Sequence, residues 1–281
     1  LGDLVKKHIN NILWLVCLTV FLLPALSGCA ALGGLFQNPD YIYEEGAVLV
    51  GGDDQPVRLG NNPEAVNVGY AELLEFIRQD PTDRLAYIAP GSTDGITPFV
   101  CSDFAELVHN NAEVSGIRAA YVGIDWSEGG LGHAVNGFET TDMGMVYIDC
   151  TGSSIYSQLE EGGQTRIMDS WDKVAYVEPG KIYGVIGLDY AEMPFYFFFE
   201  EYDRRWMEFK EKLAAYNAEV RQYNQEIRGK VFREGSRELE RIEAWKARLI
   251  QTEKEIEVIQ AELGDSRFKP LGVVKNITVH W

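Results

Sequence analysis

The spacing of apolar residues predicts two helices in the first half of the chain. The first has apolar positions at i, i+3, i+4 and i+7, occupied by Tyr70, Leu73, Leu74 and Ile77. The second begins at Cys101 and has its apolar positions at Phe104, Leu107, Val108 and Ala112. It ends near Gly116, as helices often do. Each pattern is typical of a helix that buries one face.

Alternating apolar and polar residues predict a β-hairpin after the second helix. Residues 133–138 and 145–148 have the character of short strands, and residues 141–144 supply the turn between them. An earlier strand is expected at residues 47–50, before a run of glycine and aspartate. Residues 268–281 return to strand-like alternation at the end of the chain.

A heptad pattern follows Pro194 and predicts long helices. Its apolar positions recur at spacings of three and four, at Trp206, Phe209, Leu213, Tyr216, Val220, Tyr223 and Ile227. After Gly229 and Gly235 the pattern resumes with a displaced phase, at Leu239, Ile242, Trp245, Leu249, Ile256 and Leu263. Because glycines break helices, the simplest account is an antiparallel coiled-coil hairpin. One kinked helix that dimerises is the alternative.

The composition supports a sizeable core and excludes one class of partner. Hydrophobic residues make up 46% of the chain, and the formal net charge is −18. Such an acidic protein is repelled by phosphate-rich surfaces, so nucleic acid is excluded as a partner. The 4 histidines do not share the spacing of a zinc motif. The sequence therefore predicts no metal site and no cofactor.

Cys101 is a candidate nucleophile because the pattern places it at the start of a helix. Free backbone N–H groups and the helix dipole favour a thiolate at that position. A small apolar residue that opens a buried helix is the alternative interpretation, since free cysteine is often buried. The residues that follow along the chain decide between the two.

His133 and Asp149 flank the predicted hairpin and complete a possible catalytic set. If the loop is centred on Thr141, the two residues lie directly opposite each other, with their side chains on one face. A carboxylate so placed orients an imidazole, and the imidazole exchanges a proton with a thiol. A surface histidine and a turn-capping aspartate are the alternative interpretation of the same residues.

The segment from about Pro98 to Gly152 resembles a transglutaminase-like domain of the papain-like cysteine-enzyme group. The resemblance rests on residues 100–105, 115–119, 132–134 and 148–151. It implies that Cys101 is the nucleophile, His133 the general base and then acid, and Asp149 the orienting group. This chain departs from the family at Val135, where many members have tryptophan, and at Cys150, where proline is common. Both departures bear on the shape of the substrate pocket.

The N-terminus resembles that of a bacterial lipoprotein. Lys6 and Lys7 precede an apolar run over residues 12–26, which is short for a membrane span, and the sequence Leu-Ser-Gly-Cys ends at Cys29. The resemblance implies cleavage before Cys29 and lipid attachment to its thiol. We therefore expect a protein anchored by lipid on the extracytoplasmic face of a bacterial membrane, in the cell envelope. An uncleaved anchor helix is the alternative.

These observations predict an α+β fold with a transglutaminase-like catalytic domain and a C-terminal helical hairpin. The expected segments are a signal peptide (1–28), a lipidated tether with an early strand (29–60), the catalytic domain (61–190), the coiled-coil hairpin (191–265) and a terminal strand segment (266–281). The hairpin is expected either to dock a protein partner or self-associate through residues 199–263, or to pack back onto the catalytic domain.

Three functions remain open from the sequence. The first is an enzyme that forms a thioester from an amide of a protein or peptide, then releases it to water or to an amine. The second is a cell-wall endopeptidase acting on peptidoglycan peptides. The third is a non-catalytic lipoprotein that uses the hairpin as a binding platform. Cys150 adds the alternative of a disulfide with Cys101 that would switch the site off.

Overall fold

The structure is a computed structural model that describes residues 40–44, 46–91, 95–152, 171–264 and 266–281. The expected signal peptide, the lipidation site Cys29 and the tether up to residue 39 lie outside the described residues. Within the described ranges, no helix is both long enough and apolar enough to cross a membrane.

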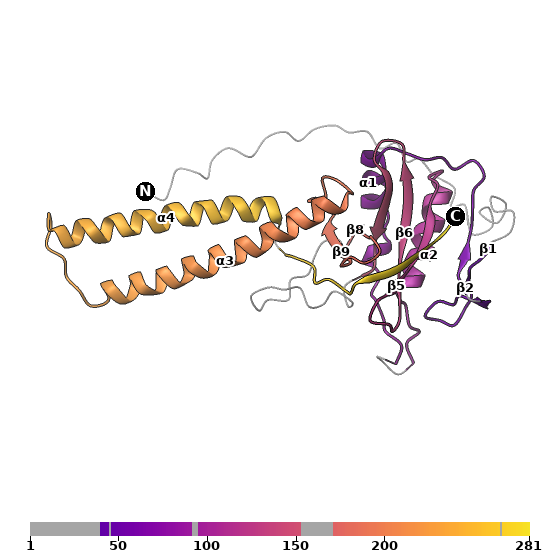
Figure 1. The fold of residues 1–281 in the computed structure, drawn as a ribbon, viewed down its shortest axis with the longest axis horizontal. Coiled ribbons are helices and arrows are strands. Elements are labelled where there is room, and N and C mark those ends of the chain that lie inside the picture. The colour runs from indigo at the N-terminus through magenta and orange to yellow at the C-terminus, as the bar shows by residue number, and fades with distance from the viewer. Residues whose placement is uncertain (1–39, 45, 92–94, 153–170, 265) are drawn as a thin grey trace, which may run out of the picture. The chain divides into compact units, whose positions relative to one another are not determined.

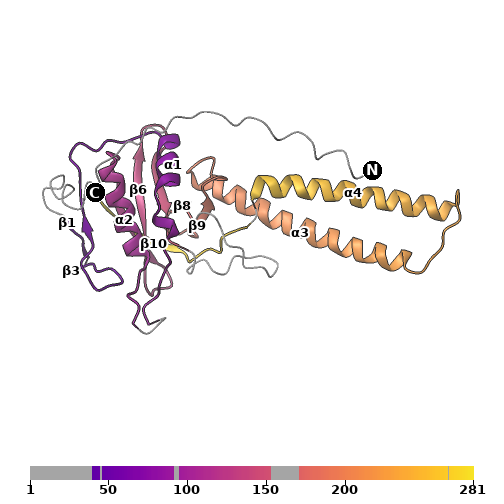
Figure 2. The ribbon, with the colours of Figure 1, turned by 180° about the vertical axis from the view of Figure 1, so that it is seen from behind.

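A six-stranded antiparallel sheet forms the centre of the fold, and its strand order is β10-β5-β6-β7-β8-β9. Its strands are β5 (Ala120–Trp126), β6 (His133–Thr140), β7 (Gly144–Asp149), β8 (Lys173–Tyr176), β9 (Gly184–Gly187) and β10 (Val274–His280). The described chain also contains four α-helices, so the expected α+β class is confirmed. Figures 1 and 2 show the sheet with helices α1 and α2 beside it.

Helices α1 (Tyr70–Gln79) and α2 (Cys101–Val114) occupy the predicted positions. The predicted stripe of α1 is buried, and α2 buries Phe104, Val108 and Ala112. Side chains from both helices share one core with β6 and β7, including Phe138 and Ile148. The amphipathic patterns therefore indicate correctly which faces of the helices meet the sheet.

The opposite face of the sheet has its own apolar cluster. Val122 and Ile124 of β5 contribute to it, together with Val135 of β6 and residues of β8 and β9. Phe268 and Leu271, from the segment that leads into β10, pack against the same cluster. The C-terminal chain thus covers this face before it joins the sheet, where Ile277 pairs with Ile124. The predicted C-terminal strand is present over residues 274–280, which is shorter than the alternation over residues 268–281 indicated.

The hairpin predicted at residues 133–148 is present, but its register is not the predicted one. Thr140 pairs with Gly144 and Asn136 pairs with Ile148, which centres the loop on residue 142 instead of Thr141. The Thr140 hydroxyl donates to the Gly144 carbonyl at 2.9 Å and accepts from the residue 143 amide at 3.1 Å. These two bonds close the turn one residue later than expected.

The corrected register places Asp149 diagonally from His133 and not directly opposite it. The displacement amounts to two positions along the partner strand, because a change of one in the loop centre moves every pair by two. Side chains in a strand alternate with a period of two, so the two residues keep a common face. The predicted proximity therefore survives although the predicted pairing is wrong.

The early strand is shorter than predicted. Residues 47–50 contain β3 (Ala47–Val48), which pairs with β2 (Tyr43–Glu44), while Val50 forms only an isolated bridge with Pro56. Another two-residue pair joins β1 (Asp40–Tyr41) to β4 (Arg58–Leu59). The chain turns back at residues 51–54, where the Asp54 amide donates to the Gly51 carbonyl at 3.2 Å. That turn ends the strand before it can lengthen.

Two long antiparallel helices, α3 (Tyr196–Ile227) and α4 (Arg237–Leu263), connect β9 to β10. They lie side by side in Figures 1 and 2, and contacts link them near both ends. The Tyr202 hydroxyl donates to the Leu263 carbonyl at 2.7 Å, and Arg241 pairs with Glu226 at 2.9 Å. Gly229 and Gly235 have φ of 70° and 69°, so the predicted breaks fall where the backbone requires glycine.

The base of α3 packs against the sheet. The ring of Phe199 stacks on Tyr176 with 5.5 Å between centroids. Gly184 of β9 lies under the same ring, because a Cβ at that position would approach it to 2.3 Å. The expected packing of the helices onto the rest of the protein is thus present at their base, where Tyr202 and Trp206 are also buried.

Candidate active site

Cys101 is the first residue of α2 and is partly exposed. The helix start is held by Asp103, whose carboxylate accepts from the Val100 amide at 2.7 Å and from the Gly52 amide at 2.9 Å. The second bond ties the turn at residues 51–54 to the helix. The placement predicted from sequence, a thiol at a helix N-terminus, is therefore present.

His133 and Asp149 are brought together as the sequence predicts. His133 is the first residue of β6 and Asp149 the last of β7, and Nε2 of the histidine lies 2.9 Å from Oδ2 of the carboxylate. Their side chains are 2% and 0% exposed. With Nε2 engaged by Asp149, Nδ1 is the nitrogen that remains for proton exchange, and it has no hydrogen-bond partner among the described residues.

Cys101 lies near this ring. Burial alone would lower the pKa of His133, but the charge and hydrogen bond of Asp149, together with the nearby Cys101 side chain, outweigh burial and raise that pKa. The imidazole is therefore held in its protonated form at neutral pH when both partners are charged. A protonated ring beside a sulfur atom is the arrangement that stabilises a thiolate.

A side-chain bond joins the strand of His133 to the helix of Cys101. The amide of Asn136 donates to the Ala105 carbonyl at 2.8 Å, and both residues are buried. Asn136 lies three positions after His133 on β6, and Ala105 lies four positions after Cys101 on α2. The bond fixes the distance between the two elements that supply the thiol and the imidazole. Sequence reasoning missed this residue, since a lone asparagine in a strand carries no motif.

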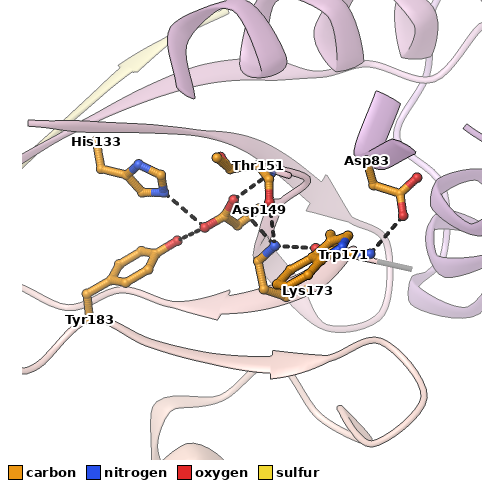
Figure 3. Close-up of polar contacts among 7 residues, drawn as sticks. All are labelled: Asp83, His133, Asp149, Thr151, Trp171, Lys173 and Tyr183. Atoms are coloured by element: carbon orange, nitrogen blue, oxygen red, sulfur yellow. Dashed lines mark hydrogen bonds and ion pairs between the residues drawn. The ribbon is translucent and has the colours of Figure 1, made fainter. Parts of the chain in front are cut away.

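Three further groups fix the Asp149 carboxylate (Figure 3). The Tyr183 hydroxyl donates to Oδ2 at 2.7 Å, the Thr151 amide donates to Oδ1 at 2.9 Å, and Lys173 Nζ lies 3.9 Å from Oδ1. The carboxylate is thus bonded on both oxygens while fully buried. Such bonding favours its ionised form and holds it in one orientation.

Lys173 is a fully buried cation, and sequence reasoning missed it. Its side chain is 0% exposed, and Nζ donates to the carbonyls of Thr151 and, over a short contact, Trp171. The Trp171 amide in turn donates to Asp83 at 2.8 Å (Figure 3). The signal available was a lysine that opens an apolar run at residues 173–177, but lysine is almost always exposed. Burial of its charge depends on the distant Asp149.

Aromatic rings enclose His133. Trp126 lies nearly parallel to the imidazole, with centroids 6.3 Å apart and an angle of 18°. Tyr183 meets it edge-on at 5.4 Å and 85°. These rings restrict rotation of the histidine and keep water from the His133–Asp149 hydrogen bond, which strengthens it.

Cys150 lies elsewhere in the core. It is buried in the cluster that contains Val108 and Ile148, whereas Cys101 packs at the edge of a different cluster. Burial, and then the nearby Asp172 carboxylate, raise the pKa of the Cys150 thiol well above its ordinary value. Both cysteines are free thiols in this structure. A disulfide between them is therefore not formed here, and Cys150 is the less reactive thiol.

An open cleft leads to Cys101 and His133. Its volume is about 1490 Å³, and its walls come from Tyr43, from residues within 47–54, 87–90, 95–102 and 121–134, and from the C-terminal segment. Tyr87 lines it close to the thiol, and burial followed by the charge of Cys101 raises the pKa of this tyrosine. In the part of the chain that the structure describes, no three His, Cys, Asp or Glu residues are grouped to hold a metal ion. The Cys101 side chain is thus accessible from this cleft.

Comparisons with known proteins identify no relative: no family model, no curated protein and no solved structure matches this chain.

Proposed function

We propose that this protein is a cysteine enzyme that acts on amide bonds of proteins or peptides through a thioester intermediate. The observation that carries the proposal is the buried hydrogen bond of 2.9 Å between His133 and Asp149, beside a partly exposed cysteine at a helix N-terminus. The bond leaves Nδ1 as the nitrogen able to exchange a proton with the thiol. A cleft gives substrate access to the pair.

The reaction would proceed in two halves. The Cys101 thiolate attacks the carbonyl carbon and a C–S bond forms, while the protonated His133 gives its proton to the departing amine as the C–N bond breaks. In the second half, His133 takes a proton from water or from an amine as it attacks the thioester, and Cys101 leaves as the thiolate. Asp149 stabilises the imidazolium present before the first half. The Cys101 amide is a candidate donor to the oxyanion.

We further propose a transglutaminase-like domain as the fold that supports this chemistry. The order of nucleophile helix, histidine strand and aspartate strand supports it, as does the position of Cys101 at the first residue of α2. The heptad pattern of α3 and α4 supports coiled-coil packing between them, with the exposed surfaces of the pair available to a protein partner. The N-terminal sequence supports attachment to the cell envelope through lipid on Cys29.

Acyl transfer from an activated ester tests the proposed nucleophile without knowledge of the substrate. The protein is incubated with p-nitrophenyl acetate, quenched in acid and analysed by intact and peptide mass spectrometry. We expect one acetyl group on the peptide that contains Cys101 and none in the Cys101→Ala variant. His133→Ala should slow the acetylation strongly, because the thiolate loses its counter-ion. Acetylation that is unchanged by both substitutions would refute the proposal.

A second addition separates hydrolysis from transamidation. When glycine methyl ester is added to the acetylated enzyme, a transamidating site releases N-acetylglycine methyl ester, whereas a hydrolase releases acetate. The partly exposed Cys101 leaves the thioester accessible to water, so acetate is expected even when amine is present.

A further inference from the structure

The cleft at Cys101 is lined by exposed apolar side chains from three segments of the chain. Tyr43 and Val50 come from the N-terminal segment, Ile96 from the loop before α2, and Leu131 from the loop between β5 and β6; all four line the cleft. They are 61%, 43%, 53% and 92% exposed. Exposed apolar residues scattered singly require no explanation, but these converge on one opening from three segments. They form a surface suited to the apolar side chains of an extended peptide.

The charge on the same walls has one sign. Asp53, Asp54 and Asp125 line the cleft, and none of the described lining residues is lysine or arginine. Asp53 accepts from the Gln55 amide at 2.9 Å, and Asp125 accepts from the side chain of Asn276 at 3.4 Å. No ion pair within the described ranges involves any of the three. Among the described residues, these three charges in the cleft lining are therefore not compensated by an ion pair.

The candidate catalytic pair lines the same cleft as these carboxylates. His133 lines the cleft with a side chain that is only 2% exposed, and its Nδ1 has no hydrogen-bond partner among the described residues. The proposed reaction uses that nitrogen to exchange a proton with Cys101, whose side chain lies nearby and lines the same cleft. The three carboxylates thus line the cleft that contains the candidate catalytic pair.

We propose that the cleft binds an extended polypeptide segment that carries a lysine or arginine side chain next to apolar residues. The basic group would lie against Asp53, Asp54 and Asp125, and the apolar residues would contact the four side chains named above. Acidic segments would be rejected, because their charges would face like charges across the cleft. The identity of this segment as substrate rests on the proposed function, whereas its binding does not.

Peptide binding to an inactive enzyme tests this proposal. The full chain with Cys101→Ala prevents turnover, and fluorescence anisotropy reports binding of a labelled peptide that alternates lysine with leucine and valine. The matched peptide has glutamate in place of every lysine. We expect the lysine peptide to bind at least about tenfold more tightly at about 0.05 M salt, with the difference shrinking at about 0.5 M. Equal affinity for the two peptides would overturn the proposal.

Charge-neutral variants locate the binding surface. Asp53→Asn combined with Asp54→Asn, and separately Asp125→Asn, should each weaken binding of the lysine peptide severalfold. Asp189→Asn is the control, because Asp189 is exposed and lies outside the cleft lining, yet its loss changes the net charge by the same amount as Asp125→Asn. A loss of affinity as large in the control as in Asp125→Asn would show that general acidity binds the peptide, and would refute the site.

The binding and acylation assays distinguish the two proposals. Charge-selective binding without acetylation of Cys101 would support the peptide-binding site and refute the proposed enzyme activity. Acetylation of Cys101 without any preference between the two peptides would support the enzyme activity and refute the proposed preference for a basic peptide.

Discussion

Replacement of Lys173 by methionine removes the buried cation behind Asp149. Methionine has a similar length and can occupy the same space, so the change deletes the charge and the donors with little loss of packing. Lys173 Nζ lies 3.9 Å from the Asp149 carboxylate and donates to the Thr151 carbonyl at 3.0 Å and to the Trp171 carbonyl. The substitution leaves all three acceptors without this donor.

The expected cost follows from burial. Both side chains of the Lys173–Asp149 pair are 0% exposed, so solvent does not screen the pair. Removal of one partner from a buried pair costs about 3–5 kcal/mol, because the remaining charge stays in the interior. Since Asp149 keeps its bonds from Tyr183 and Thr151, we expect the lower end of that range.

Urea unfolding followed by tryptophan fluorescence measures this cost. Lys181→Met is the matched control, because Lys181 is exposed and pairs with Glu178 at the surface. The Lys173→Met midpoint should fall well below that of the native protein, whereas the control should stay close to it. Equal midpoints for the two variants would refute the view that Lys173 is a buried counter-ion. If Lys173→Met does not fold, Tyr183→Phe tests the same carboxylate with the loss of one hydrogen bond, and an unchanged midpoint there would contradict its role.

Two further predictions concern the core. Burial lowers the pKa of His109 to about 4, so the folded protein keeps this side chain neutral while the unfolded chain protonates it near pH 6.5. The stability that the neutral His109 contributes is present above about pH 6.5 and is lost as the pH falls toward 4, by about 3 kcal/mol in total. His109→Gln should therefore flatten the acid limb of a plot of unfolding free energy against pH. An unaltered slope would contradict the assignment of this pH dependence to His109. Gly184→Ala should destabilise by about 1–3 kcal/mol, since its Cβ would meet the Phe199 ring at 2.3 Å, whereas at Gly187 the nearest atom is 3.9 Å away. Thermal unfolding of Gly184→Ala and Gly187→Ala compares them directly, and equal losses would contradict the close packing.

The local features of this fold could be predicted from sequence because they depend on neighbouring residues. The stripe of α1, the start of α2 at Cys101 and the two glycines between α3 and α4 each rest on short-range patterns. The hairpin register was missed by two positions because the side chain of Thr140 closes the turn one residue later than the loop sequence alone indicates. His133 and Asp149 still lie on the same face of the sheet despite that error, because side chains in a strand alternate with a period of two.

Of the candidate site, only the three proposed catalytic residues could be predicted from the sequence. Cys101, His133 and Asp149 belong to residue types with known chemistry, so their patterns drew attention. Tyr183 and Lys173 reach Asp149 from β9 and β8, and nothing in a single sequence reports which distant strands become neighbours. A lysine in particular is expected at the surface, and only the buried carboxylate explains its position.

The pH dependence of Cys101 alkylation is the most direct test of the central claim, that Cys101 and His133 form an activated pair. The rate of iodoacetamide labelling is measured on the peptide containing Cys101, in the native protein and in His133→Ala, both with Cys150→Ser. The account predicts rapid labelling that persists down to about pH 6 and a fall of at least about tenfold there when His133 is removed. Slow labelling that is the same with and without His133 would contradict it.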